Sequence, residues 1–161
     1  MPTDPKLVSL RQITAETVRQ VTELAVHPNQ EHFVASNAVS LAQALFSPEA
    51  WYRAVYVGEE MAGFVMLCDE SLRTPPAEAP EVGVWRFMID AGFQGRGVGR
   101  AALGLVIEHV RSMGRFESLS LSYVPGPGCP EKFYLGLGFR HTGTVDDGEI
   151  VLALPLDRNS A

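Results

Sequence analysis

Hydrophobic and polar residues recur along this chain with two different periods, which predict two kinds of element. Alternating or continuously apolar runs predict strands, and apolar residues three or four positions apart predict helices. The strands are predicted at Lys6–Ile13, Trp51–Val57, Ala62–Cys68, Glu81–Asp90, Glu117–Val124, Phe139–Thr144 and Glu149–Leu154. The helices are predicted from an N-cap at Thr14 to about Val26, and at Ser36–Phe46, Gly97–Met113 and Glu131–Leu137. This order predicts an α/β (α+β) fold with a mixed sheet and helices on both faces.

The helix at Gly97–Met113 has the clearest amphipathic pattern. Its apolar stripe consists of Val98, Ala102, Leu105, Val106, Val110 and Met113. Arg100, Glu108 and Arg111 lie on the opposite face, as expected for a helix that covers a sheet. Gly114 follows the last turn, where glycine commonly ends a helix.

Composition and charge narrow the class of protein. The chain has 161 residues, which predicts one domain, 1–161. Its net charge of −6 disfavours nucleic acid as a partner, because neutralising phosphates requires a basic face. The N-terminus lacks the basic and apolar regions of a signal peptide, and no apolar run approaches the roughly 20 residues that span a membrane. We therefore expect a cytoplasmic protein without a membrane partner.

A glycine-rich turn precedes the amphipathic helix. It reads Gln94-Gly95-Arg96-Gly97-Val98-Gly99. Glycine allows positive φ and close approach of a ligand to the backbone, and the start of a helix has unpaired N–H groups that bind phosphate. Arg96 and Arg100 add positive charge beside the turn. The alternative is a turn that only packs a helix against a strand.

Two common phosphate-binding motifs do not fit this turn. A P-loop requires Gly-Lys-Ser/Thr, whereas Arg100 and Ala101 follow Gly99. A dinucleotide fingerprint fits the letters, with Glu117 20 residues after Gly97. However, Glu117 begins its strand instead of ending it, and the strand before the turn is the fourth. Too little chain follows for the rest of a dinucleotide domain.

A third pattern, Gln/Arg-x-x-Gly-x-Gly/Ala, is matched by Gln94, Gly97 and Gly99. Here the chain resembles the GNAT superfamily of N-acetyltransferases. The segment Phe133-Tyr134-Leu135-Gly136-Leu137-Gly138-Phe139 resembles a second motif of that family. The resemblance implies a mainly antiparallel sheet of about seven strands, with a splay between the fourth and fifth strands. It also implies that Gln94, Gly95, Arg96, Gly97, Val98, Gly99 and Arg100 bind the pyrophosphate of acetyl-CoA.

Further segments resemble the polyamine and diamine (spermine/spermidine) acetyltransferase branch. They are Phe33–Asn37, Ser40–Ala44, Trp85–Asp90 and Leu121–Gly126. This resemblance implies acetyl transfer to the primary amine of a small molecule, by direct attack in a ternary complex. Two alternatives stay open: acetylation of proteins or peptides, and a non-catalytic module that binds acetyl-CoA. Relatives of this type are often homodimers.

The resemblance also implies roles for individual residues. Backbone N–H groups near Met88 and Ile89 would hold the thioester carbonyl, which requires a bulge or an early end to pairing in the fourth strand. Tyr134 is the predicted general acid, because a phenol can reprotonate the leaving thiolate. Glu81 is the candidate general base, and Glu31 the candidate carboxylate for a cationic substrate. The alternative for both is a carboxylate that is only solvated at the surface.

Two further observations concern ligands. The family usually has Asn-x-x-Ala before the helix that carries the tyrosine, and this chain has Pro127 and Pro130 at those places. The missing asparagine removes a possible contact with the pantetheine arm. The four histidines, His27, His32, His109 and His141, lack metal-binding spacing, so no metal is expected.

Overall fold

The predicted strands form one continuous sheet. The computed structural model describes residues 1–156, so the last five residues of the predicted domain lie outside the described part. The strands are β1 (Val8–Arg11), β2 (Ala50–Val57), β3 (Glu60–Asp69), β4 (Val82–Ile89), β5 (Ser118–Tyr123), β6 (Arg140–Asp146) and β7 (Glu149–Pro155). Their order in space is β1-β2-β3-β4-β5-β7-β6. Only the β4–β5 pair is parallel, which confirms the predicted mainly antiparallel fold.

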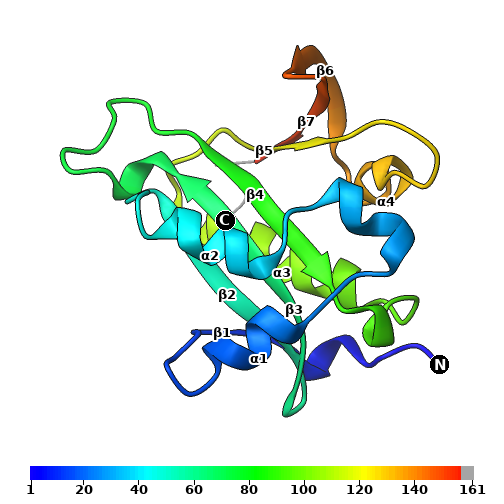
Figure 1. The fold of residues 1–161 in the computed structure, drawn as a ribbon. Helices are drawn as coiled ribbons and strands as arrows, with labels where there is room; N and C mark the ends of the chain where they lie inside the picture. The colour runs from blue at the N-terminus through cyan, green and yellow to red at the C-terminus, as the bar shows by residue number, and fades with distance from the viewer. Residues whose placement is uncertain (157–161) are drawn as a thin grey trace.

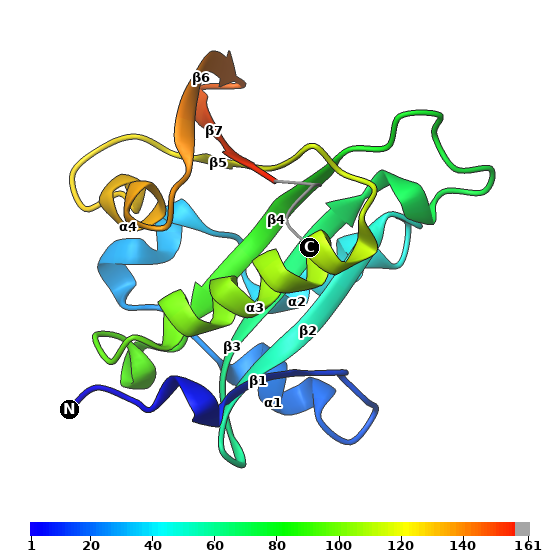
Figure 2. The same cartoon turned by 180° about the vertical axis from the view of Figure 1, so that it is seen from behind.

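Helices cover both faces of the sheet, as predicted. One face carries α1 (Val18–Glu23) and α2 (Asn37–Ala44), which lie in front of the sheet in Figure 1. The opposite face carries α3 (Val98–Met113), seen in front in Figure 2. A short helix, α4 (Glu131–Gly136), follows β5. No helix within residues 1–156 combines the length and apolarity that crossing a membrane requires.

The central strands are apolar on both sides because both sides are covered. On β3, Phe64 and Met66 pack in the cluster that includes Val21 of α1. The neighbouring Val65 and Leu67 pack with Leu103 of α3. All four β3 side chains are at most 1% exposed. The nearly continuous apolar run in this strand is therefore the sequence of a strand buried on both faces.

The boundaries of α3 agree with the sequence prediction, whereas those of the first helix do not. Helix α1 has only six residues, because Thr14 does not act as its N-cap. Instead, the Thr14 N–H donates to Oγ1 of Thr17 at 2.9 Å and the Thr17 N–H donates to the Thr14 carbonyl at 3.1 Å, which forms a separate turn. A 3₁₀-helix that the sequence analysis did not predict, η2 (Pro28–Phe33), follows α1.

The β4 and β5 strands separate after a short stretch of pairing. Their paired residues run only from Val82 to Val84 on β4. On the other side of β4, Met66 pairs with Arg86 and Leu67 with Val84, so Trp85 is an extra residue that forms a β-bulge. Pairing with β5 ends where this bulge begins. Both the predicted splay and the predicted irregularity in the fourth strand are confirmed.

Candidate active site

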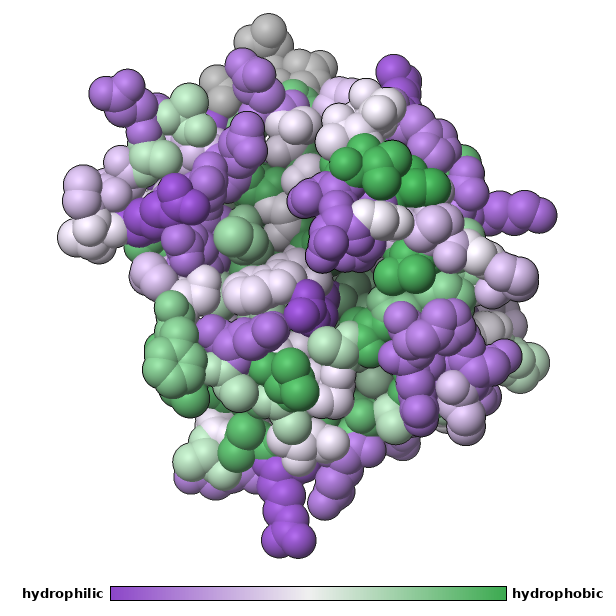
Figure 3. All heavy atoms as spheres, turned by 45° about the horizontal axis from the view of Figure 1, so that its top comes forward, coloured by the Kyte–Doolittle hydropathy of each residue, from purple (hydrophilic) through white to green (hydrophobic). Residues whose placement is uncertain are grey.

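The splay between β4 and β5 opens into a cleft of about 1230 Å³. Residues of β4, β5, α4, η2 and the glycine-rich turn line it, and the β6–β7 hairpin closes one side. Figure 3 shows the surface hollowed near its centre, with hydrophobic residues (green) in the hollow and hydrophilic residues (purple) on its rim. This size and mixture of surfaces suits a bound small molecule.

The glycine-rich turn (residues 94–99) presents backbone to this cleft. Gly95 and Gly97 have φ values of +76° and +82°, a region that other L-residues adopt only with strain. A Cβ at either position would meet no protein atom within 4 Å, so both positions border open space. Gly97 is the N-cap of α3, and the first intrahelical bond runs from the Ala101 N–H to the Gly97 carbonyl at 3.1 Å. The N–H groups before Ala101 are free for an anion at the positive end of the helix dipole.

The third glycine of the motif serves packing. A Cβ on Gly99 would lie 3.4 Å from Cζ of Phe133 and 3.5 Å from Cγ1 of Ile89. These are ordinary van der Waals distances, so Gly99 brings the start of α3 close to both α4 and the end of β4 and leaves room for little more than a methyl group. Val98 is buried beside it at 1% exposed, and Arg96 and Arg100 are exposed. Arg100 lines the cleft. The Arg96 guanidinium instead lies 5.4 Å from the centroid of the Phe93 ring, and Arg96 is not among the described residues that line the cleft.

The side chain of Gln94 is engaged within the protein. Its Nε2 donates to the Ile89 carbonyl and to Oε1 of Gln30, at 2.9 Å each. In return, Nε2 of Gln30 donates to Oε1 of Gln94 at 3.1 Å. Sequence reasoning assigned Gln94 to coenzyme binding. The structure leaves its backbone at the turn and uses its side chain to connect the turn to β4 and η2.

Met88 and Ile89 end β4 beyond the last residue that pairs with β5. Their side chains are 6% and 8% exposed and belong to clusters on opposite faces of the sheet. Both residues line the cleft. Backbone groups on the β5 side of this segment therefore lack a strand partner, as the predicted carbonyl-binding role requires.

Tyr134 lies on α4 and lines the cleft at 8% exposed. Its ring packs between Phe133, at 5.3 Å between centroids, and Phe139, at 6.0 Å. Burial raises the pKa of Tyr134 to about 12, because the apolar surroundings disfavour the phenolate. The phenol therefore stays protonated at neutral pH and can donate a proton.

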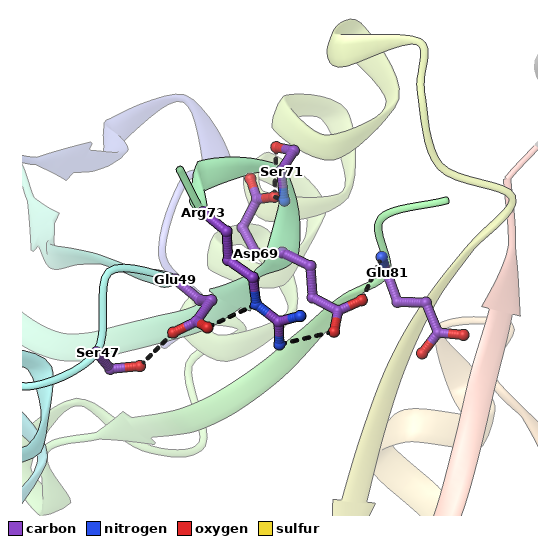
Figure 4. Close-up of polar contacts among 7 residues, drawn as sticks. Ser47, Glu49, Asp69, Ser71, Arg73 and Glu81 are labelled. Atoms are coloured by element: carbon purple, nitrogen blue, oxygen red, sulfur yellow. Dashed lines mark hydrogen bonds and ion pairs between the residues drawn. The ribbon is translucent and has the colours of Figure 1, made fainter. Parts of the chain in front are cut away.

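The two predicted carboxylates occupy different places. Glu31 is exposed on η2 and lines the cleft. Glu81 is exposed just before β4 and is not among the described residues that line the cleft. Its N–H donates to Oε1 of Glu70 at 2.9 Å, and its carboxylate points away from that contact (Figure 4). The structure brings Glu31 and Tyr134 to one cleft and does not bring Glu81 there.

The network around Glu70 fixes the connection between β3 and β4. Arg73 Nε donates to Glu49 at 2.7 Å and its Nη2 lies 2.9 Å from Glu70 (Figure 4). Glu49 also accepts from the hydroxyl of Ser47 at 2.7 Å. These hydrogen bonds lower the pKa of Glu49 to about 2, with Ser47 making the larger contribution. The network positions a loop, and Glu81 is attached to it.

Sequence reasoning missed three charged residues that line the cleft: Arg86, Asp146 and Glu149. Arg86 is half-buried, and its Nη2 donates to Oε1 of Gln43 at 3.1 Å. Burial lowers the pKa of Arg86, and the charge of Glu149 partly opposes this. The bulge at Trp85 changes which side chains of β4 face the cleft, so strand alternation could not assign Arg86. Asp146 and Glu149 lie at the two ends of the predicted hairpin turn. This position was the only sequence feature that could have marked them.

Comparison with known proteins identifies the class. The sequence model of the Acetyltransferase (GNAT) family matches residues 10–139, and the chain belongs to this family. It is an N-acetyltransferase that uses acetyl-CoA.

Individual proteins of known sequence or structure are similar to this chain. The chain is 26% identical over 155 residues to a spermine/spermidine N(1)-acetyltransferase of Bacillus subtilis (strain 168), covering 92% of this chain and 99% of that protein. The ribosomal-protein-S18-alanine N-acetyltransferase of Escherichia coli has a similar fold, with a TM-score of 0.67, 17% identity, and coverage of 93% of this chain and 94% of that chain. A Bacillus subtilis acetyltransferase solved in complex with CoA has a TM-score of 0.63 and 16% identity, with coverage of 93% and 98%.

Proposed function

We propose that this enzyme acetylates the primary amine of a small, polyamine-like molecule by direct attack within a ternary complex. The observation that carries this proposal is a group of three carboxylates in the described lining of the cleft outside residues 94–100, where they outnumber the arginine present, Arg86. We call these carboxylates the acceptor wall and define it as Glu31 of η2 and Asp146 and Glu149 of the β6–β7 hairpin. Carboxylates around a cleft favour a cationic acceptor. The likeness to a spermine/spermidine acetyltransferase supports the same substrate class.

The opposite part of the cleft suits the coenzyme. We call residues 94–100 the coenzyme wall. Its free N–H groups and Arg100 would hold the pyrophosphate. The end of β4 at Met88 and Ile89 would then lie along the thioester, where backbone donors stabilise the oxygen that gains charge. Such donors contribute roughly 2.7–4 kcal/mol in other enzymes.

Tyr134 completes the proton balance of the reaction. Acetyl-CoA supplies an activated acetyl group, and the amine nitrogen bonds to its carbonyl carbon while the carbon–sulfur bond breaks. The leaving sulfur takes a proton from the Tyr134 hydroxyl, and the amine nitrogen releases its proton to water. A proton from solvent then restores the phenol, so the products are the amide and the CoA thiol. Because the apolar surroundings that raise the pKa of Tyr134 also disfavour a thiolate, the phenol does not need a low pKa to act as the acid.

A thiol-release assay tests the substrate class. Purified protein and acetyl-CoA are mixed with spermidine, with a neutral-side-chain peptide bearing a free N-terminus, and with a lysine-containing peptide. We expect spermidine to have the highest kcat/KM. A peptide that outperforms spermidine would identify a protein acetyltransferase, and the absence of thiol release with any acceptor would contradict catalysis of acetyl transfer to amines.

A further inference from the structure

A pair of glutamine side chains joins the coenzyme wall to the acceptor side of the cleft. The primary amides of Gln30 and Gln94 exchange two hydrogen bonds, at 2.9 and 3.1 Å. Gln94 also donates to the Ile89 carbonyl at 2.9 Å. Gln94 follows η4 (Ala91–Phe93), and the residues are far apart in sequence. The pair is therefore a tertiary contact between two segments that meet at the cleft.

The same Gln30 side chain determines where η2 begins. Its Oε1 accepts from the His27 N–H at 3.2 Å, and the Gln30 N–H donates to the His27 carbonyl at 2.8 Å. The first bond is the contact that the third residue of a helix makes in a capping box, and the second is the backbone bond that closes the first turn of η2. One side chain thus both starts η2 and holds it against Gln94.

Segment η2 contributes four consecutive residues, 30–33, to the lining of the cleft. Glu31 and Phe33, immediately after Gln30, line the cleft. The Phe33 ring lies 4.0 Å from the place that a Cβ on Gly128 would occupy, in the loop before α4. The segment therefore extends from the coenzyme wall at Gln30 to the α4 side at Phe33, and it carries Glu31 between them.

We propose that Gln30 is a positioning residue for the acceptor, which holds η2 in order when coenzyme occupies the glycine-rich turn. This inference rests on the proposed function, because it assumes that the coenzyme binds at that turn. Phosphate bound to the backbone restricts the turn and with it Gln94, and the amide pair transmits this order to η2. Because binding couplings are reciprocal, an ordered acceptor wall also favours coenzyme binding.

Another contact fixes only the beginning of this connection. The Ala25 N–H donates to Oδ1 of Asp90 at 2.9 Å, and the Ala91 N–H donates to the Ala25 carbonyl at 2.9 Å. These bonds hold the chain before Pro28 and do not reach η2 itself. Removing the Gln30 side chain should therefore release η2 while the preceding segment stays attached.

Hydrogen exchange measured with CoA alone tests this proposal on the full chain. In the wild-type protein, CoA should slow amide exchange in residues 28–36 about tenfold, as expected for a net contribution of about one hydrogen bond. In Gln30→Leu the slowing should fall below about twofold, although CoA still binds. Gln20→Leu, at an exposed position on α1, is the matched control and should behave as the wild type. The proposal would be overturned if CoA slowed amide exchange as much in Gln30→Leu as in the wild type, or if it did not slow exchange in the wild type.

A second variant and a kinetic measurement separate positioning from loss of fold. Gln30→Glu keeps the oxygen that accepts from Gln94 and His27 but loses the N–H that donates to Gln94. In this variant CoA should therefore slow amide exchange in residues 28–36 about threefold. Slowing by the full tenfold would also overturn the proposal. With spermidine, Gln30→Leu should raise the acceptor KM about five- to tenfold and change kcat less than twofold. A fall in kcat as large as the rise in KM would overturn the positioning role. Failure of spermidine acetylation would contradict the proposed substrate class and leave the exchange result with CoA unaffected.

Discussion

On the coenzyme wall the proposed binding groups come from consecutive residues, 94–100, whereas on the acceptor wall they come from η2 and from the β6–β7 hairpin. The first wall uses backbone N–H groups whose directions follow from Gly95, Gly97 and the start of α3. The second uses side chains at the ends of elements that meet only in the folded chain. The geometry of a site built from backbone groups depends on local conformation. The geometry of a site built from side chains of distant segments depends on the whole fold. The two walls should therefore respond differently to substitution.

The largest effect is expected where the two walls meet, at Tyr134. Tyr134→Phe removes the hydroxyl and keeps the ring that packs against Phe133 and Phe139. We expect kcat to fall about 10²- to 10⁴-fold, the usual contribution of a general acid, and the Kd of CoA to change less than about twofold. Thiol release and calorimetric titration with CoA measure the two quantities. Unchanged kcat would remove Tyr134 from the mechanism.

A substitution in the turn should affect mainly the coenzyme wall. Gly97→Ala places a Cβ at a φ of +82°, which costs about 1–2 kcal/mol. The turn will shift to relieve this strain, and CoA binding should weaken about tenfold. Gly104→Ala is the matched control, because Gly104 lies within α3 and a Cβ there meets no atom within 4 Å. If both variants bind CoA with wild-type affinity, the backbone geometry of the turn is not what holds the coenzyme.

A substitution on the acceptor wall should affect only the amine. Glu149→Gln removes a half-buried carboxylate of the cleft whose Oε1 accepts from the Ser122 hydroxyl at 3.3 Å. We expect the KM for spermidine to rise about three- to tenfold, in line with one charge contact, with the KM for acetyl-CoA unchanged. Glu108→Gln, exposed on α3, serves as the control. The same rise in Glu108→Gln would show that net charge, and not the acceptor wall, attracts the amine.

The smallest effect is expected at Glu81. Glu81 lies outside the described lining of the cleft, and its backbone N–H is bonded to Glu70 of the Arg73 network. Glu81→Gln should therefore change kcat less than about twofold at every pH between 6 and 9. A larger loss that grows as the pH falls would support the sequence-based prediction that Glu81 is the general base.

The sequence was informative where local geometry determines structure. The apolar stripe and flanking glycines of α3 predicted its limits. The motif at Gln94, Gly97 and Gly99 predicted a glycine-rich turn before that helix, and phosphate binding by this turn stays a prediction. The resemblance to a known family added the splay, which no local pattern in β4 or β5 shows.

The sequence was less informative where tertiary contacts determine the local structure. Thr14 has the residue type of an N-cap, but its turn with Thr17 delays the first helix. Arg86 could not be placed, because the bulge at Trp85 interrupts the alternation of β4. Gln30 has no motif at all, since its function depends on Gln94, 64 residues later.

The most direct test of the central claim, that the backbone of the glycine-rich turn holds the pyrophosphate, is amide NMR with two ligands. CoA contains the pyrophosphate, and pantetheine has the same thiol arm without it. The N–H signals of Gly95, Gly97 and Gly99 should shift with CoA and stay in place with pantetheine, whereas signals from β4 near Met88 should respond to both. Equal shifts of the three glycines with pantetheine, or none with CoA, would contradict this assignment of the turn.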